Sequence, residues 1–146
     1  MESTTKAVPI ILKAAKSLTQ YLEKDVARYG LNPAEFSALE LLYHKGPQAI
    51  KGIGNKLLLA GSSMTYVIDK LTEKAYVTRS TCPTDRRQTT IVLTDAGRNF
   101  VASIFTSHEQ AIAQVFSVLS NEEYTQLTTL LKKVGYQSRQ LLEEGQ

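Results

Sequence analysis

The segment KGIGNKLLLAGSSMTYVIDKLTEKAYVTRSTCPTDRRQTTIVLT, residues 51–94, contains the patterns that decide the fold. Apolar residues near its start predict a short helix over residues 50–58, and LLAGSS then interrupts the helical pattern. A second helix is expected because one apolar stripe recurs at the spacing of a helical face, at Met64, Val67, Ile68 and Leu71. Two short helices joined by a tight break form the helix-turn-helix pattern.

The rest of the segment predicts a β-hairpin. YVTRST and QTTIVLT are rich in β-branched residues, which favour strands, and they flank a tip near residues 82–87 that contains proline and charged residues. A helix-turn-helix followed by a hairpin is a winged helix. We therefore expect a mainly α fold with a small β-hairpin wing.

Further helices are predicted before and after this segment. An amphipathic pattern over residues 8–29 ends at Gly30, and Asn32-Pro33-Ala34-Glu35 has the cap, the proline and the acid of a helix start. Downstream, Thr94-Asp95 and a capping box at Ser120-Asn121-Glu122-Glu123 predict two long helices.

These patterns predict a single domain over residues 1–146. A winged-helix lobe would cover roughly 33–98, with flanking helices at roughly 5–29 and 99–144. The flanking helices have wider apolar faces than a small domain needs to cover itself. The residues of these apolar faces include Val8, Leu12, Leu18, Leu22, Leu127, Leu130, Leu131, Val134, Leu141 and Leu142. Exposed stripes of this kind usually bury against a partner, most simply a second copy of the chain.

The charge of the chain is uneven. The formal net charge is +3, but residues 51–98 have eight Lys or Arg against four Asp or Glu, a net of +4. Residues 101–146 have three basic against five acidic residues, a net of −2. An anionic partner is therefore expected at the middle of the chain.

Composition excludes several other classes of protein. A single cysteine rules out an internal disulfide framework and a multi-cysteine zinc site. No apolar run approaches the roughly 18–20 residues that span a bilayer, so no membrane partner is expected. The first residues lack the pattern of a secretion signal, and we expect a cytoplasmic protein.

The outer face of the second helix of the helix-turn-helix is polar. Ser62, Ser63 and Thr65 lie near its start, Tyr66 follows, and Lys70 lies one turn further on. A helix fits the DNA major groove, where hydroxyl groups reach base edges and a lysine suits a phosphate. An ordinary solvated helix face would show the same pattern, so the helix alone leaves both interpretations open.

The expected hairpin tip favours DNA binding. Arg86 on a thin ribbon can enter the minor groove, and Asp85 beside it can fix the direction of the guanidinium group. Arg79 and Arg87 add positive charge on either side. A charged turn with no function is the alternative, but the position directly after a helix-turn-helix favours a DNA contact.

The chain resembles the multiple antibiotic resistance regulator (MarR) family over nearly its whole length. The matching landmarks are Val67-Ile68-Asp69-Lys70-Leu71, Glu73-Lys74-x-Tyr76-Val77, Asp85-Arg86-Arg87 and Leu93-Thr94-Asp95-x-Gly97. The resemblance implies a homodimeric winged-helix repressor, dimerised through its terminal helices, that binds a pseudo-palindromic operator in double-stranded DNA. It also implies release by a small, often phenolic, ligand or by cysteine oxidation. LNPAEFSALELLYHKGPQ and TYVIDKL are most similar to regulators of quinone and phenol stress.

The chain departs from the family pattern in the helix-turn-helix. Leu58 stands where the family often has glycine, and Ala60 stands at the usual position of a capping serine. The second helix is therefore expected to start one or two residues late, at Gly61-Ser62. Tyr66 replaces a frequent arginine, so the guanine contact that an arginine supplies is absent.

Aromatic side chains suit a site for an aromatic effector. The candidates are Tyr21, Phe36, Tyr43, Phe105 and His108, and the alternative for each of them is an ordinary core residue. Cys82 suggests an alternative, thiol-based redox sensing, because Arg79, Arg86 and Arg87 would stabilise its thiolate. The chain has no second cysteine to resolve a sulfenic acid.

An enzyme is not expected. His44 and His108 lie far apart, and no nucleophile, metal-ligand or phosphate-loop motif surrounds them, so we expect no metal and no cofactor. A winged helix that docks on proteins without binding DNA remains as another alternative.

Overall fold

The computed structural model describes residues 3–57, 61–81 and 89–145, and its description of side chains leaves out residues 61 and 62. A short 3₁₀ turn, η1 (Thr4–Lys6), precedes the first α-helix. The α-helices are α1 (Ala7–Ala27), α2 (Pro33–Lys45), α3 (Ile50–Leu57), α4 (Gly61–Glu73), α5 (Asp95–Phe116) and α6 (Asn121–Glu144), and the strands are β1 (Gln48–Ala49), β2 (Val77–Thr81) and β3 (Thr89–Leu93).

The chain forms two compact units, residues 1–108 and 109–146. The first unit contains α1–α4, the sheet and the first part of α5, and the second contains the end of α5 and all of α6. The mainly helical fold with a small antiparallel sheet confirms the expected fold class.

The helix starts that the sequence predicted are present. The Asn32 side chain accepts a hydrogen bond from the Glu35 backbone N–H at 2.8 Å, and the Glu35 carboxylate accepts one from the Asn32 N–H at 2.9 Å. Ser120 and Glu123 form the second reciprocal capping box, which begins α6. Thr94 caps α5, because its hydroxyl accepts a hydrogen bond from the Gly97 N–H at 2.9 Å.

The winged helix adopts the expected order, with one strand more than the sequence indicated. Strands β2 and β3 pair antiparallel from Val77↔Leu93 to Thr81↔Thr89. The two-residue β1 pairs on the other side of β3, which gives the sheet order β1-β3-β2. Two residues are too few to show an alternating pattern, so the sequence gives no sign of this strand.

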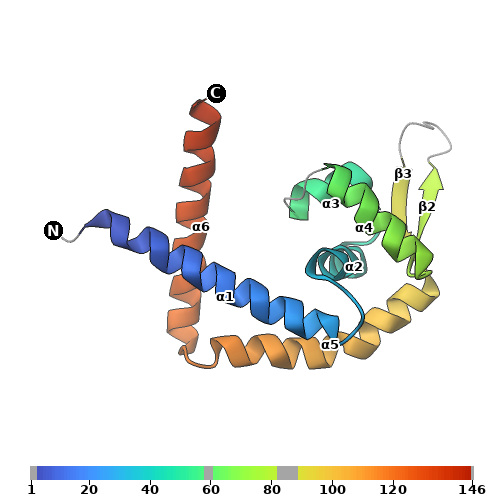
Figure 1. The fold of residues 1–146 in the computed structure, drawn as a ribbon, viewed down its shortest axis with the longest axis horizontal. Coiled ribbons are helices and arrows are strands. Elements are labelled where there is room, and N and C mark those ends of the chain that lie inside the picture. Colours follow the sequence, from blue (N-terminus) through green and yellow to red (C-terminus); the bar gives the residue numbers. More distant parts are fainter. Residues whose placement is uncertain (1–2, 58–60, 82–88, 146) are drawn as a thin grey trace. The chain divides into compact units, whose positions relative to one another are not determined.

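A single hydrophobic core holds the first unit together. In Figure 1, α2 lies beside the α3–α4 pair, and the β2–β3 hairpin lies at the far end of α4. The stripe predicted on α4 is buried, with Ile68 and Leu71 both at 0% exposure. These side chains share the core with Leu39 and Leu42 of α2 and Ile91 of β3, among others. The winged helix is therefore built around the inner face of α4.

The turn that connects α4 to the wing is tightly packed. Ala75 has a φ of +65°, in the left-handed region that favours glycine. The Thr94 hydroxyl donates to the Ala75 carbonyl at 2.6 Å, and the Thr94 N–H donates to the Tyr76 carbonyl at 3.0 Å. Gly97 lies so close that a Cβ atom there would overlap the Tyr76 carbonyl oxygen. A side chain at position 97 is therefore incompatible with the approach of α5 to this turn.

We predict that Gly97→Ala destabilises the protein. The added Cβ would collide with backbone rather than with a flexible side chain, so the start of α5 must shift, and overpacking of this kind costs about 3 kcal/mol. Urea unfolding followed by circular dichroism measures the loss. Asn99→Ala, at an exposed position of the same helix, is the control and should change the free energy of unfolding by less than about 0.5 kcal/mol. Equal stability of the two variants would contradict the close approach.

Candidate nucleic-acid interface

Helix α4 presents opposite faces to the core and to solvent. Met64, Val67, Ile68 and Leu71 face inward, and at least 96% of each is buried. Ser63, Thr65 and Tyr66 are exposed on the other side, and Tyr66 keeps 60% of its surface accessible. The predicted contact residues that the structure describes on this helix therefore lie on its solvent face. The side chain of Ser62 lies outside the description.

Lys70 also lies on α4, and two neighbouring side chains interact with it. Its ammonium group is 5.4 Å from the centre of the Tyr66 ring and 3.6 Å from a Glu73 carboxylate oxygen. The Lys70 side chain remains 41% exposed, so it still reaches solvent. Both contacts lie within α4, and they leave Lys70 in the last turn of the helix.

Arg79 of β2 forms an ion pair with α4. Its guanidinium Nη2 lies 2.7 Å from the Asp69 carboxylate oxygen Oδ1. The sequence pattern placed Arg79 among the DNA contacts and gave Asp69 no role. The two residues lie ten positions apart on different elements, and only the folded hairpin brings them together.

The predicted wing tip lies outside the described residues. Cys82, Asp85, Arg86 and Arg87 all belong to residues 82–88. The strands on either side, β2 and β3, pair antiparallel, as predicted for the hairpin.

The C-terminal end of α4 is anchored to the turn between α1 and α2. The Lys74 ammonium group donates to the Gly30 carbonyl at 2.8 Å and contacts the Glu35 carboxylate at 3.0 Å. Glu35 is buried, and its other oxygen accepts the Asn32 backbone N–H. The same carboxylate thus caps α2 and fixes the end of α4. The Asn32–Glu35 box was predictable from the sequence, but the lysine 39 residues away was not.

A second polar cluster joins α1, α2 and α5 within the first unit. The buried Asp25 carboxylate accepts a hydrogen bond from Arg28 at 2.6 Å and lies 3.0 Å from Nδ1 of His108. The hydrogen bond to Asp25 raises the pKa of Arg28 above its ordinary value, so Arg28 stays charged. The other nitrogen of His108 is 3.9 Å from a Glu40 carboxylate oxygen.

Four of the five residues predicted for an effector site form two pairs of neighbouring rings. The ring centroids of Phe36 and His108 lie 4.2 Å apart, and those of Tyr43 and Phe105 lie 6.4 Å apart. Phe36 is buried in the core, which fits the alternative that it is a packing residue. Tyr21 lies on α1 and is 37% exposed.

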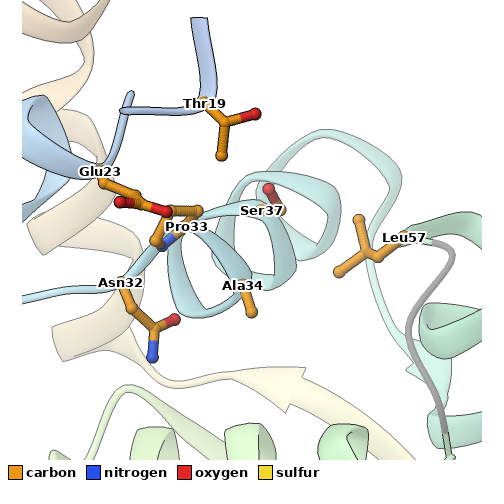
Figure 2. Close-up of a pocket in the computed structure, with 7 residues that line it drawn as sticks. All are labelled: Thr19, Glu23, Asn32, Pro33, Ala34, Ser37 and Leu57. Carbon is orange, nitrogen blue, oxygen red and sulfur yellow. The ribbon is translucent and has the colours of Figure 1, made fainter. Parts of the chain in front are cut away.

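A depression lies between α1, α2 and α3 (Figure 2). It has a volume of about 410 Å³, and its lining includes Pro33, Ala34 and Leu57 together with the polar Glu23 and Asn32. Thr19 and Ser37 complete its lining. The predicted effector residues do not belong to this set.

Within the described part of the chain, the structure shows no metal site and no membrane-spanning helix. There, no group of three or more His, Cys, Asp or Glu side chains is placed to hold a metal ion. Among the same residues, no helix is long and apolar enough to cross a membrane.

The fold and the exposed face of α4 define a winged helix-turn-helix protein. A model of the MarR family matches residues 31–89. The helix-turn-helix transcriptional regulator MhqR of Bacillus subtilis (strain 168) is 42% identical over 139 residues, which cover 95% of this chain and 96% of that protein. The chain belongs to the MarR family. Members of this family are transcriptional regulators and not enzymes, which confirms the expectation of a non-enzymatic regulator.

Solved structures show the same fold. AbsC, a MarR family regulator from Streptomyces coelicolor, has a TM-score of 0.85 at 24% identity, covering 95% of this chain and 97% of that one. Sco3205, a MarR family regulator from the same organism that was crystallised in complex with DNA, has a TM-score of 0.84 at 21% identity, covering 92% and 89% of the two chains. The expected arrangement of a winged helix with flanking helices is therefore shared with these proteins.

Proposed function

We propose that the chain is a homodimeric, cytoplasmic repressor that binds a pseudo-palindromic operator in double-stranded DNA. The observation that carries this proposal is the solvent face of α4, which is polar and exposed while the opposite face is buried. Such a helix can enter the major groove while its apolar face stays buried in the core. The structural relative Sco3205 was crystallised in complex with DNA, which supports DNA as the partner.

The proposed DNA contacts come from the exposed face of α4 and from the wing. Ser62, Ser63, Thr65 and Tyr66 would meet the major groove, and Lys70 would contact a phosphate. In the wing, Arg86 would enter the minor groove, with Asp85 directing its guanidinium group and Arg87 adding charge. The net charge of +4 over residues 51–98 supports a phosphate-rich partner.

We predict salt-dependent DNA binding that Lys70→Gln weakens. Loss of one lysine–phosphate contact should weaken binding about tenfold at low salt and reduce the salt slope by about one per lysine. Fluorescence anisotropy measures both quantities, with a labelled duplex from the region upstream of the chain's own gene. Analytical ultracentrifugation of the complex should show two chains on each duplex.

The control for this experiment is Lys45→Gln. Lys45 is exposed at the end of α2, outside the proposed DNA contacts and dimerisation segments, so this variant removes the same charge from a residue with no proposed role. Its affinity and salt slope should equal those of the unchanged protein. Binding that is absent or independent of salt would refute DNA recognition and favour a protein-docking winged helix.

The proposed dimer rests on the exposed apolar faces of the terminal helices. On α1, Ile10 and Leu12 are 67% and 63% exposed. On α6, the exposed apolar residues are Leu130, Leu131, Val134, Leu141 and Leu142. Apolar stripes of this kind are costly in water unless a partner covers them, and a second copy of the chain supplies matching stripes. We assign dimerisation to the predicted helical segments, residues 5–29 and 99–144.

We predict that Val134→Glu converts the dimer into a monomer. A carboxylate buried without a partner opposes association by several kcal/mol, so the dissociation constant should rise by at least about 100-fold. Sedimentation equilibrium measures the change. Thr129→Glu is the control, because Thr129 is exposed on the opposite face of α6, and it should leave the dimer intact. A Val134→Glu dimer as tight as the original would contradict the role of this face.

We further propose that a small phenol- or quinone-like molecule releases the operator, as part of a stress response. The support is the resemblance to quinone- and phenol-responsive regulators. Tyr21, Phe36, Tyr43, Phe105 and His108 remain the effector residues that we propose.

We predict that phenol or hydroquinone releases the DNA duplex from the unchanged protein and from Cys82→Ser alike. A directly bound ligand does not need the thiol, so the two proteins should show midpoints of release within about twofold of each other in an anisotropy titration. Hydrogen peroxide in place of the phenol tests the alternative. Release by peroxide that disappears in Cys82→Ser would overturn direct ligand binding and favour redox sensing.

A further inference from the structure

The ion pair between Arg79 and Asp69 joins the first strand of the wing to the exposed face of α4. Val77 and Arg79 lie on the same face of β2, because side chains alternate along a strand. Val77 is 2% exposed against the core, and this orientation directs Arg79 toward α4. There its Nη2 meets Asp69 Oδ1 at 2.7 Å. The pair is therefore a direct link between α4 and β2, the first strand of the wing.

Asp69 lies on the part of α4 that carries the proposed DNA contacts. It follows Tyr66 by three residues and precedes Lys70 by one, and its side chain is 52% exposed. A free carboxylate at that place would repel DNA phosphates. Arg79 neutralises it, and a guanidinium group that is hydrogen-bonded to a carboxylate has fewer donors for a phosphate.

Stability of the fold does not explain the pair. The Arg79 side chain is 41% exposed, and ion pairs between exposed side chains contribute little to folding free energy. The pair instead restricts the direction of β2 relative to α4. Arg79 lies two residues before the end of β2, and the strand leads into the segment that contains Arg86.

We propose that Arg79 is a positioning residue, which acts on DNA binding through Asp69 and not by contacting a phosphate itself. The pair holds the wing in a defined direction relative to α4 and cancels the charge of Asp69. This inference rests on the DNA-binding function proposed above. It makes Asp69, an acid on a DNA-binding face, necessary for tight binding.

The experiment compares the DNA affinities of Asp69→Asn, Arg79→Ala and the double variant, using the duplex and the anisotropy assay described above. Asp69→Asn removes a negative charge from the DNA-facing helix, so a direct Arg79–phosphate contact predicts tighter binding. Positioning predicts the opposite, a loss of about five- to tenfold. Arg79→Ala should cause a similar or larger loss, because it leaves Asp69 without its partner.

The double variant separates coupling from independent effects. If the two residues act as a pair, Asp69→Asn combined with Arg79→Ala should bind no more weakly than Arg79→Ala alone. Its salt slope should equal that of the unchanged protein, because a neutral pair replaces a neutral pair. A direct phosphate contact would lower the slope by about one for each arginine lost.

Glu73→Gln is the matched control. Glu73 is an exposed acid one turn beyond Asp69 on the same helix, and its described partner is Lys70 of that helix rather than a residue of the wing, so the variant leaves Lys70 free for a phosphate. Removing its charge should leave affinity unchanged or increase it. Thermal unfolding midpoints of all the variants should agree within about 2 °C, since the exposed pair contributes little to stability.

The outcomes distinguish this inference from the proposed function. If the unchanged protein does not bind the duplex, the proposed function fails. If it binds and Asp69→Asn binds equally well or more tightly, Arg79 is not a positioning residue. A salt slope of the double variant that is lower by about one for each arginine overturns the inference in the same way. Weaker binding by Asp69→Asn with unchanged binding by Glu73→Gln supports it.

Discussion

The burial of one face of α4 is the constraint on which the rest of the structure depends. Ile68 and Leu71 are fully buried, and they contact a core formed by α2, α3 and the sheet. Each such side chain contributes about 1.5–3 kcal/mol when it leaves water, so the helix cannot rotate about its axis without a large loss. Because the inner face is fixed, the outer face is fixed as well, and Ser63, Thr65 and Tyr66 remain in solvent.

Polar contacts at the end of α4 add direction to this burial. Lys74 joins the helix to Gly30 and Glu35, and Arg79 joins it to the wing through Asp69. Thr94 and Gly97 then bring α5 against the turn that contains Ala75. Apolar burial is not directional, whereas a hydrogen bond or ion pair restricts both distance and angle. The two kinds of interaction together place α4 relative to its neighbours on both sides.

Much of the fold was predictable because its signals are local. The Asn32–Glu35 and Ser120–Glu123 boxes each need residues only three apart, and the α4 stripe repeats within two turns. Contacts between distant residues were not predictable in this way. His108 lies 83 residues from Asp25, and no spacing rule connects them. For the same reason, the sequence identified Arg79 as a cation near the wing but not its pairing with Asp69.

The sequence by itself determined the order of the helices and of the β2–β3 hairpin, the buried side of α4 and the charge of the middle segment. Periodicity and capping depend on neighbours within a few residues, which the chain order states directly. Tertiary structure decided which polar side chains meet. Strand β1 forms because β3 offers it hydrogen-bonding partners, Lys74 finds Glu35 across the α1–α2 turn, and Arg79 faces Asp69 across the hairpin. These contacts depend on the path of the chain through space, and that path exists only after the core has formed.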